Sequence, residues 1–196
     1  MKLITFKIDE TNAIILELPR VLAEAFRYDE IFVFLNQNNQ NKNILYQDFL
    51  IAGLRDFERG LSDAISGKLN RDNEVGDLGY LWNEKLNGKK LPMTMDAEGN
   101  KFWVGQQFIL FDSPEPATTW LFEKNKKFWI EITPVYPWHH TDPKEGEKFI
   151  TYEEFMKSYK PIAFFEVSRE TLEEWQKKVQ ELLATVEAND GKHINE

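Results

Sequence analysis

Five apolar residues recur at helical spacing in the first third of the chain. Steps of four, three, four and four place them on one stripe of an α-helix: Leu50, Leu54, Phe57, Leu61 and Ile65. We expect a helix over roughly residues 44–66 that Gly67 ends, because glycine adopts the left-handed conformation that closes many helices. A helix that is apolar on one side needs an apolar surface to cover, and the rest of the sequence must supply it.

Segments with the patterns of β-strands lie on both sides of this helix. They are residues 3–8, 12–18, 31–35, 101–111, 118–123, 127–133 and 161–167. The continuous apolar run 31–35 favours a strand that is buried on both faces. Lys124, Asn125 and Lys126 favour a hairpin turn between two of the later strands. The Asn/Gln-rich run 36–43 is typical of a loop.

Two more helices are expected near the C-terminus. Thr151 and Glu154 match a capping box, which begins a short helix that must end before Pro161. The last helix has a clean apolar stripe, formed by Leu172, Trp175, Val179, Leu182 and Val186. Strands and helices are segregated along the chain, which predicts the α+β class: a mainly antiparallel sheet with a long central helix and a C-terminal helix packed on one face. We expect residues 1–190 to form one domain and 191–196 a frayed tail.

Two stretches carry weaker patterns. Residues 67–100 are polar and rich in glycine, so they contain either short elements or an exposed flap. Residues 101–111 are rich in aromatic side chains and predict one strand region, in which Gly105 is expected to form a bulge.

The charge of the chain limits its partners. It carries 24 basic and 33 acidic residues, a net charge of −9 at pH 7. An acidic chain without a basic block lacks the positive footprint that nucleic acids require, and anionic membranes are disfavoured for the same reason. A basic protein partner is compatible with this charge.

The chain has no cysteine, which excludes disulfides, thiolate metal sites and thiol catalysis. The N-terminus alternates polar and apolar residues, unlike a signal peptide, and no apolar run approaches the length of a membrane-spanning helix. These features predict a bacterial-type cytoplasmic protein.

The best polar cluster follows a proline-rich stretch. It consists of Trp138, His139, His140 and Asp142, to which Glu131 on a nearby strand can be added. Histidine and aspartate serve metal binding and acid–base chemistry. Adjacent histidines point apart in extended backbone, however, and the chain has no H-x-x-x-H or H-E-x-x-H spacing. We therefore expect no metal and no cofactor, and treat the five residues as candidate binding residues.

Searches for nucleophile and phosphate-binding motifs assign no catalytic residue. The chain has no G-x-S-x-G elbow, no P-loop and no G-x-G-x-x-G fingerprint. Trp103, Trp120 and Trp129 are expected to be buried against the long helix. The alternative is an exposed set of rings that would stack on sugars or anchor a protein partner. Trp138 is expected to lie outside the sheet, because Pro137 precedes it.

One predicted hairpin resembles a hairpin found in other proteins. Residues 119–122 (Thr-Trp-Leu-Phe) and 130–138 (Ile-Glu-Ile-Thr-Pro-Val-Tyr-Pro-Trp) look like the hairpin of several uncharacterised bacterial proteins. These are similar in style to the small acidic immunity proteins of contact-dependent and polymorphic toxin systems. The resemblance covers residues 44–138 and carries over no catalytic residue. It implies a neutralising role, in which acidic side chains face a basic toxin domain.

Three functions are compatible with these observations. The first is a non-catalytic protein-interaction module, an immunity or antitoxin-like inhibitor with a protein partner, because such a protein needs only complementary charge and a few aromatic anchors. The alternative is a hydrolase or sugar-binding protein that uses residues 138–142 with Glu131, if their side chains converge on a pocket. The third is a structural protein of a phage or conjugative element. Nothing in the sequence marks an oligomeric state.

Overall fold

The strands form two antiparallel sheets and a short ribbon. A computed structural model describes residues 1–38, 41–71, 76–95, 98–112, 117–139, 142–143 and 145–193. The first sheet has the order β1 (Lys2–Lys7), β2 (Asn12–Leu18), β3 (Glu30–Gln37), β4 (Asn41–Phe49). The second has the order β10 (Ala163–Val167), β9 (Lys127–Pro134), β8 (Ala117–Lys124), β7 (Ile109–Asp112). The ribbon pairs β5 (Met93–Met95) with β6 (Lys101–Trp103).

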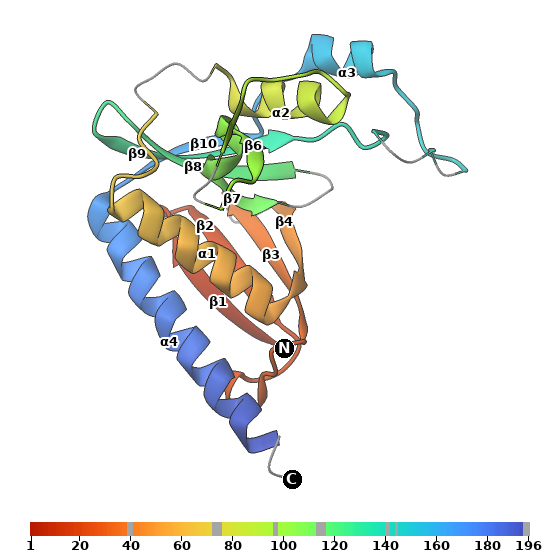
Figure 1. Cartoon of the computed structure of the whole chain (residues 1–196). Coiled ribbons are helices and arrows are strands. Elements are labelled where there is room, and N and C mark those ends of the chain that lie inside the picture. Colours follow the sequence, from red (N-terminus) through yellow and green to blue (C-terminus); the bar gives the residue numbers. More distant parts are fainter. Residues whose placement is uncertain are drawn as a thin grey trace.

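The helices lie on two levels. The elements are α1 (Leu50–Ile65), α2 (Leu78–Leu86), α3 (Tyr152–Ser158), α4 (Arg169–His193) and the 3₁₀ turns η1 (Leu22–Glu24) and η2 (Val104–Phe108). Figure 1 shows α1 and α4 side by side against the first sheet, the second sheet across their end, and α2 and α3 beyond it. The predicted α+β class with antiparallel strands is confirmed, and the strands are divided between two sheets.

Aromatic rings join the layers into one apolar cluster. Phe57 on α1 contacts Phe6 on β1 and Trp175 on α4, with ring centroids 4.9 and 6.0 Å apart. Phe57 also contacts Phe111 on β7 at 5.0 Å, which continues the cluster into the second sheet. Burial of so many rings supplies a large share of the driving force for folding. None of the helices within the described ranges is long and apolar enough to cross a membrane.

The predicted start of the long helix is wrong. The helix begins at Leu50 and not near residue 44, because residues 41–49 form β4. The predicted loop 36–43 is likewise wrong in part, since β3 continues to Gln37 and β4 starts at Asn41. The end of the helix is as expected: Gly67 has a φ of 79° and its N–H donates to Ala64 O at 3.0 Å.

The run 31–35 is buried on one face only. Ile31, Val33 and Leu35 are at most 3% exposed, whereas Phe32 and Phe34 are partly exposed. An antiparallel sheet can leave one face uncovered, and helices α1 and α4 lie on the side of the odd-numbered residues. The prediction of a strand buried on both faces is therefore wrong.

The two weaker stretches contain short elements. Residues 67–100 hold α2 and β5. Residues 101–111 form β6, η2 and the start of β7 rather than one strand. Gly105 lies in η2, where an added Cβ would come within 2.3 Å of the Trp103 ring, so the expected bulge at Gly105 is wrong. The register shift lies between Ile109 and Phe111 instead.

The C-terminal elements match their sequence signals. Thr151 and Glu154 form the capping box of α3. The predicted stripe of α4 is at most 6% exposed at Leu172, Trp175, Val179, Leu182 and Val186. The limits of the domain at 1–190 and of the frayed tail at 191–196 stay predictions.

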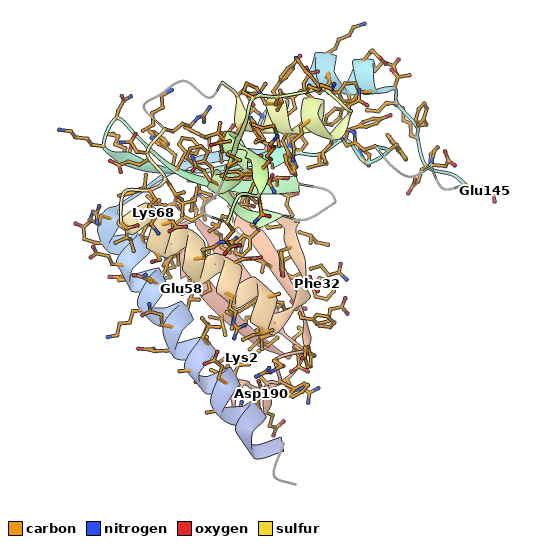
Figure 2. All side chains as sticks on the ribbon, in the orientation of Figure 1. Lys2, Phe32, Glu58, Lys68, Glu145 and Asp190 are labelled. Carbon is orange, nitrogen blue, oxygen red and sulfur yellow. The ribbon has the colours of Figure 1, made fainter. Side chains whose placement is uncertain are left out.

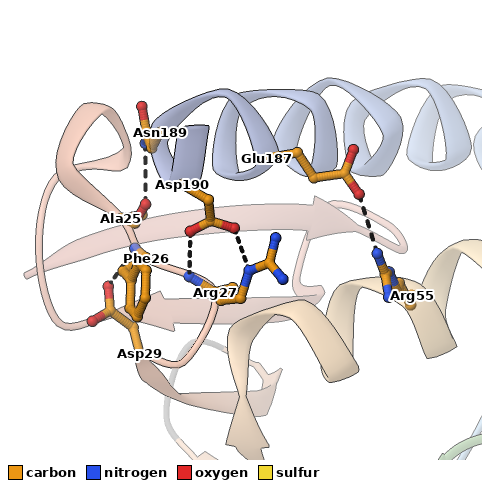
Figure 3. A network of polar contacts seen from close by, with 8 residues as sticks. All are labelled: Ala25, Phe26, Arg27, Asp29, Arg55, Glu187, Asn189 and Asp190. Atoms are coloured by element: carbon orange, nitrogen blue, oxygen red, sulfur yellow. Dashed lines mark hydrogen bonds and ion pairs between the residues drawn. The ribbon is translucent and has the colours of Figure 1, made fainter. Parts of the chain in front are cut away.

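Buried polar groups hold the end of α4 against the turn that follows η1 (Figure 3). Asp190 is 3% exposed; its carboxylate pairs with the Arg27 guanidinium and accepts from Arg27 N at 3.3 Å. Asn189 Nδ2 donates to Ala25 O at 3.1 Å. Asp29 accepts from Phe26 N at 2.9 Å within the same turn. The last turns of α4 therefore fix the entry into β3.

We expect the Asp190→Ala variant to lower the Tm by about 5 °C, because it removes a charge-assisted pair and leaves the Arg27 N–H without its acceptor. The matched control is Glu187→Ala, one turn earlier on α4, whose pair with Arg55 is exposed at 51% and 63%. Exposed pairs contribute little, so its Tm should change by less than about 2 °C. Thermal unfolding followed by circular dichroism measures both. Equal Tm values for the two variants would contradict a stabilising role of the buried pair.

Candidate functional site

Two of the predicted site residues, Trp138 and His139, pack against the ring of Tyr136. The Trp138 ring lies 5.6 Å from that of Tyr136 and 5.3 Å from that of Phe149. His139 Nε2 is 3.4 Å from Asn83 Oδ1 on α2. Asp142 is exposed, and His140 lies outside the described residues. Among the residues that the structure describes, no three His, Asp or Glu side chains gather as metal ligands would.

Asn83 explains this arrangement. Its side chain is fully buried, and Nδ2 donates to Gly79 O and Pro134 O, each at 2.9 Å. Its Oδ1 accepts from Tyr136 N at 2.7 Å. These hydrogen bonds attach the segment after β9 to α2. Trp138 and His139 therefore lie where this attachment places them.

Glu131 belongs to a different group of side chains. We call Arg71, Asp77, Glu131, Thr133 and Tyr159 the Glu131 cluster. Glu131 is 6% exposed, and its Oε2 lies 3.9 Å from Arg71 Nη1. The two side chains are 8% and 12% exposed. A distance of 3.9 Å makes an ion pair but is too long for a hydrogen bond.

The cluster joins four segments: residues 69–71, the start of α2, β9 and the residue that ends α3. Residues 69–71 run beside β8: Glu123 N donates to Leu69 O at 2.8 Å and Arg71 N to Glu123 O at 2.7 Å. Asp77 caps α2, where its Oδ1 accepts from Tyr80 N at 2.8 Å and from the Tyr159 hydroxyl at 3.1 Å.

Gly79 allows α2 to approach β9. A Cβ at this position would come within 2.3 Å of Tyr159 Oη and 2.4 Å of Thr133 Cβ. The cluster therefore contacts the first turn of α2, whereas His139 contacts Asn83 in the next turn. The described contacts of Glu131 and of His139 form separate sets.

Burial dominates the electrostatics of the cluster. Burial and, to a smaller extent, the charge of Asp77 raise the pKa of Glu131 to about 7, while Arg71 opposes the shift. Burial also lowers the pKa of Arg71, which stays protonated because its ordinary pKa is so high. Burial and then Asp77 raise the pKa of Tyr159. A carboxyl group that exchanges its proton near neutral pH is typical of functional sites.

The cluster lies on one face of the second sheet, between a buried region at Trp120 and an exposed region at Phe164. Cross-strand pairing aligns Trp120, Glu131 and Phe164 on one face. Trp120 is fully buried beneath the rings of Trp82 on α2 and Trp103 on β6. Phe164 is 52% exposed and stacks on Trp129, with ring centroids 4.6 Å apart and planes at 15°. We call Trp129 and Phe164 the aromatic platform.

Of these residues only Glu131 was predicted as a site residue; Arg71, Asp77, Tyr159 and Phe164 are among those that were not. Only Asp77 carries a local signal, as an aspartate directly before a helix is a common N-cap. Arg71, Tyr159 and Phe164 join Glu131 through pairing between distant segments, which the sequence does not display. Of the tryptophans expected to be buried, Trp103 and Trp120 are at most 1% exposed, whereas Trp129 is only partly buried.

A second surface with an unusual composition is the solvent-facing side of the first sheet. We define the outer face as Leu3, Ile15, Phe32, Phe34, Ile44 and Phe49, which register places on one side of β1 to β4. The rings of Phe32 and Phe34 are 5.9 Å apart and nearly parallel. Figure 2 shows Phe32 on the side of the molecule opposite α4.

Exposed rings and acids border this face. Phe49 is 49% exposed, and its ring lies 5.6 Å from that of Tyr28, which is 57% exposed. Glu30 is directly opposite Phe49 and Glu17 opposite Phe32 in the strand pairing. Glu17 and Glu30 therefore lie beside apolar side chains on this face, which also carries Thr5 and Lys7.

Comparisons with known proteins give no relative from which a role could be transferred. No family model matches the chain, and no curated protein and no solved structure matches it either.

Proposed function

We propose that the chain is a non-catalytic protein-interaction module that binds a basic protein domain on its outer face. The observation that carries this proposal is a sheet face with three phenylalanines, Phe32, Phe34 and Phe49, on the side away from α1 and α4. A water-exposed apolar face that several strands share is a common feature of binding surfaces.

The aromatic residues suit the role of anchors. Hot spots in protein interfaces are enriched in aromatic side chains that enter pockets of the partner. Phe49 and Tyr28 are about half exposed and contact each other, so little side-chain freedom is lost when they are covered.

Charge supports a basic partner. Glu17 and Glu30 lie on the same side of the sheet as the phenylalanines, and Asp48 adjoins Phe49. The whole chain carries a net charge of −9. Complementary charge accelerates association with a basic surface and disfavours acidic competitors.

Within this class, an immunity or antitoxin-like inhibitor is the specific role we propose. The acidic charge and the resemblance of the hairpin within residues 119–138 support it. The partner would be a toxin domain with a basic surface, which the chain neutralises by covering it.

The test uses the protein encoded by the neighbouring gene as the probe. Co-purification, titration calorimetry and survival of cells that express both proteins report binding and protection. We expect Phe49→Asp to weaken binding about tenfold or more, because a buried charge would replace an aromatic anchor.

The matched control is Phe164→Asp, whose ring on the second sheet is 52% exposed, against 49% for Phe49. It should bind like the wild type. Equal affinities of the Phe49→Asp variant and the wild type would remove the outer face from the proposal. No binding of any neighbouring product by the wild type would overturn the inhibitor role.

The alternative function, a hydrolase or sugar-binding protein using residues 138–142 with Glu131, stays a second proposal. It requires His139 or His140 to converge with Asp142 and Glu131 on a concave pocket. His139 contacts Asn83 on α2, whereas Glu131 pairs with Arg71, which gives that arrangement less support than the outer face has.

A further inference from the structure

We propose that the Glu131 cluster and the aromatic platform together form a binding site for a neutral carbohydrate ring. This site is on the second sheet and includes none of residues 138–142. It is independent of the interaction proposed for the outer face of the first sheet.

The first argument is unused hydrogen-bonding capacity. The Arg71 guanidinium and the Glu131 carboxylate are both about nine-tenths buried and face each other at 3.9 Å. Among the described residues, no hydrogen bond reaches the Glu131 carboxylate. The Arg71 guanidinium also lies 4.7 Å from the centre of the Phe122 ring, and both charged groups keep some surface exposed, so each can still form a hydrogen bond with a ligand. A ligand hydroxyl between the two groups would accept from Arg71 and donate to Glu131.

The charges of the cluster favour a neutral ligand. A cation would be repelled by Arg71, and an anion would be repelled by Asp77 and by Glu131 in its charged form. A sugar hydroxyl is neutral and is both a donor and an acceptor, which matches a carboxylate and a guanidinium side by side. Charge-assisted hydrogen bonds of this kind are stronger than neutral ones.

The platform supplies the apolar half of the site. Phe164 is directly opposite Glu131 in the pairing of β10 with β9, so its ring lies on the same face as the carboxylate. It is 52% exposed and stacks on Trp129. An apolar C–H face of a sugar ring can cover such a ring, while its hydroxyl edge points towards Glu131. Arg71 and Glu131 keep 12% and 8% of their side-chain surface exposed, so both remain within reach of a ligand.

The experiment titrates the full chain with glucose, galactose, mannose and N-acetylglucosamine, with adenine and free arginine as planar and cationic probes. Saturation-transfer NMR detects binding and tryptophan fluorescence measures its Kd. We expect at least one sugar to bind, and Phe164→Ala to weaken that binding about tenfold. Glu131→Gln should weaken it as well, because the amide replaces one carboxylate acceptor with a donor.

Phe49→Ala is the matched control, since this ring is exposed to a similar degree on the other sheet. It should leave sugar binding unchanged, and circular dichroism checks that each variant is folded. The proposal is overturned if none of the sugars binds the wild type, if adenine or arginine binds in their place, or if Phe164→Ala and Phe49→Ala have the same Kd as the wild type. Loss of partner binding in Phe49→Asp with intact sugar binding would separate this site from the outer face.

Discussion

The Trp120→Ala variant is expected to lose about 4 kcal/mol of unfolding free energy, because removal of a fully buried large aromatic side chain sacrifices its burial and leaves a cavity. The Trp120 ring is 0% exposed and contacts those of Trp82 and Trp103, at centroid distances of 6.2 and 6.3 Å. Its Nε1 donates to Thr133 Oγ1 at 2.8 Å, so the substitution also leaves a buried hydroxyl without its donor.

The three rings belong to β8, α2 and β6, so their contact holds α2 and the ribbon on the second sheet. Chemical denaturation followed by far-UV circular dichroism measures the loss without relying on tryptophan fluorescence. Trp138→Ala is the control, since this ring is only partly buried and should cost about 1–2 kcal/mol. A loss for Trp120→Ala no larger than that for Trp138→Ala would show that the three-ring contact is not a centre of stability.

The helices were the most predictable part of the fold. The stripe that starts at Leu50 and the capping box at Thr151 are local patterns, and local patterns decide where a helix is amphipathic and where it starts. The start of α1 was misplaced because β4 is rich in polar residues and resembles a loop. Pairing with β3 stabilises β4 despite that composition, which is a tertiary effect on a weak local preference.

The run 31–35 shows why the outer face was not predicted. Five consecutive apolar residues are equally consistent with a strand buried on both sides and with one whose second face is left to bind a partner. Which of the two arrangements forms depends on where α1 and α4 lie, and no local sequence pattern indicates their position. The surface that carries the proposed function therefore appeared only once the layers were known.

The candidate site shows the same limit. The sequence marks Glu131 as an acid on a strand beside a polar loop. It does not indicate that Glu131 is buried beside Arg71, because residues 69–71 join β8 through backbone hydrogen bonds. In a short segment, the residue types do not reveal whether its backbone will pair with a strand. Phe164 was part of an expected strand, but its place opposite Glu131 depends on the register between β10 and β9.

The titration of Glu131 should make the stability of the protein depend on pH. Its pKa is about 7 in the folded chain against an ordinary value of 4.5, so the folded state holds the proton more tightly than the unfolded state. The stabilisation from this proton is complete below the unfolded pKa and is lost as the pH rises from 4.5 to about 7. Glu131→Gln cannot titrate and lacks this loss.

We therefore expect the unfolding free energy of the wild type, minus that of Glu131→Gln, to fall by about 2.5 kcal/mol between about pH 5 and about pH 8. Urea denaturation of both proteins across this range measures the difference, and other titrating groups cancel because both proteins share them. A difference that is independent of pH would mean that Arg71 fully compensates the buried carboxylate, so that Glu131 is charged at all these pH values and its burial has no energetic cost.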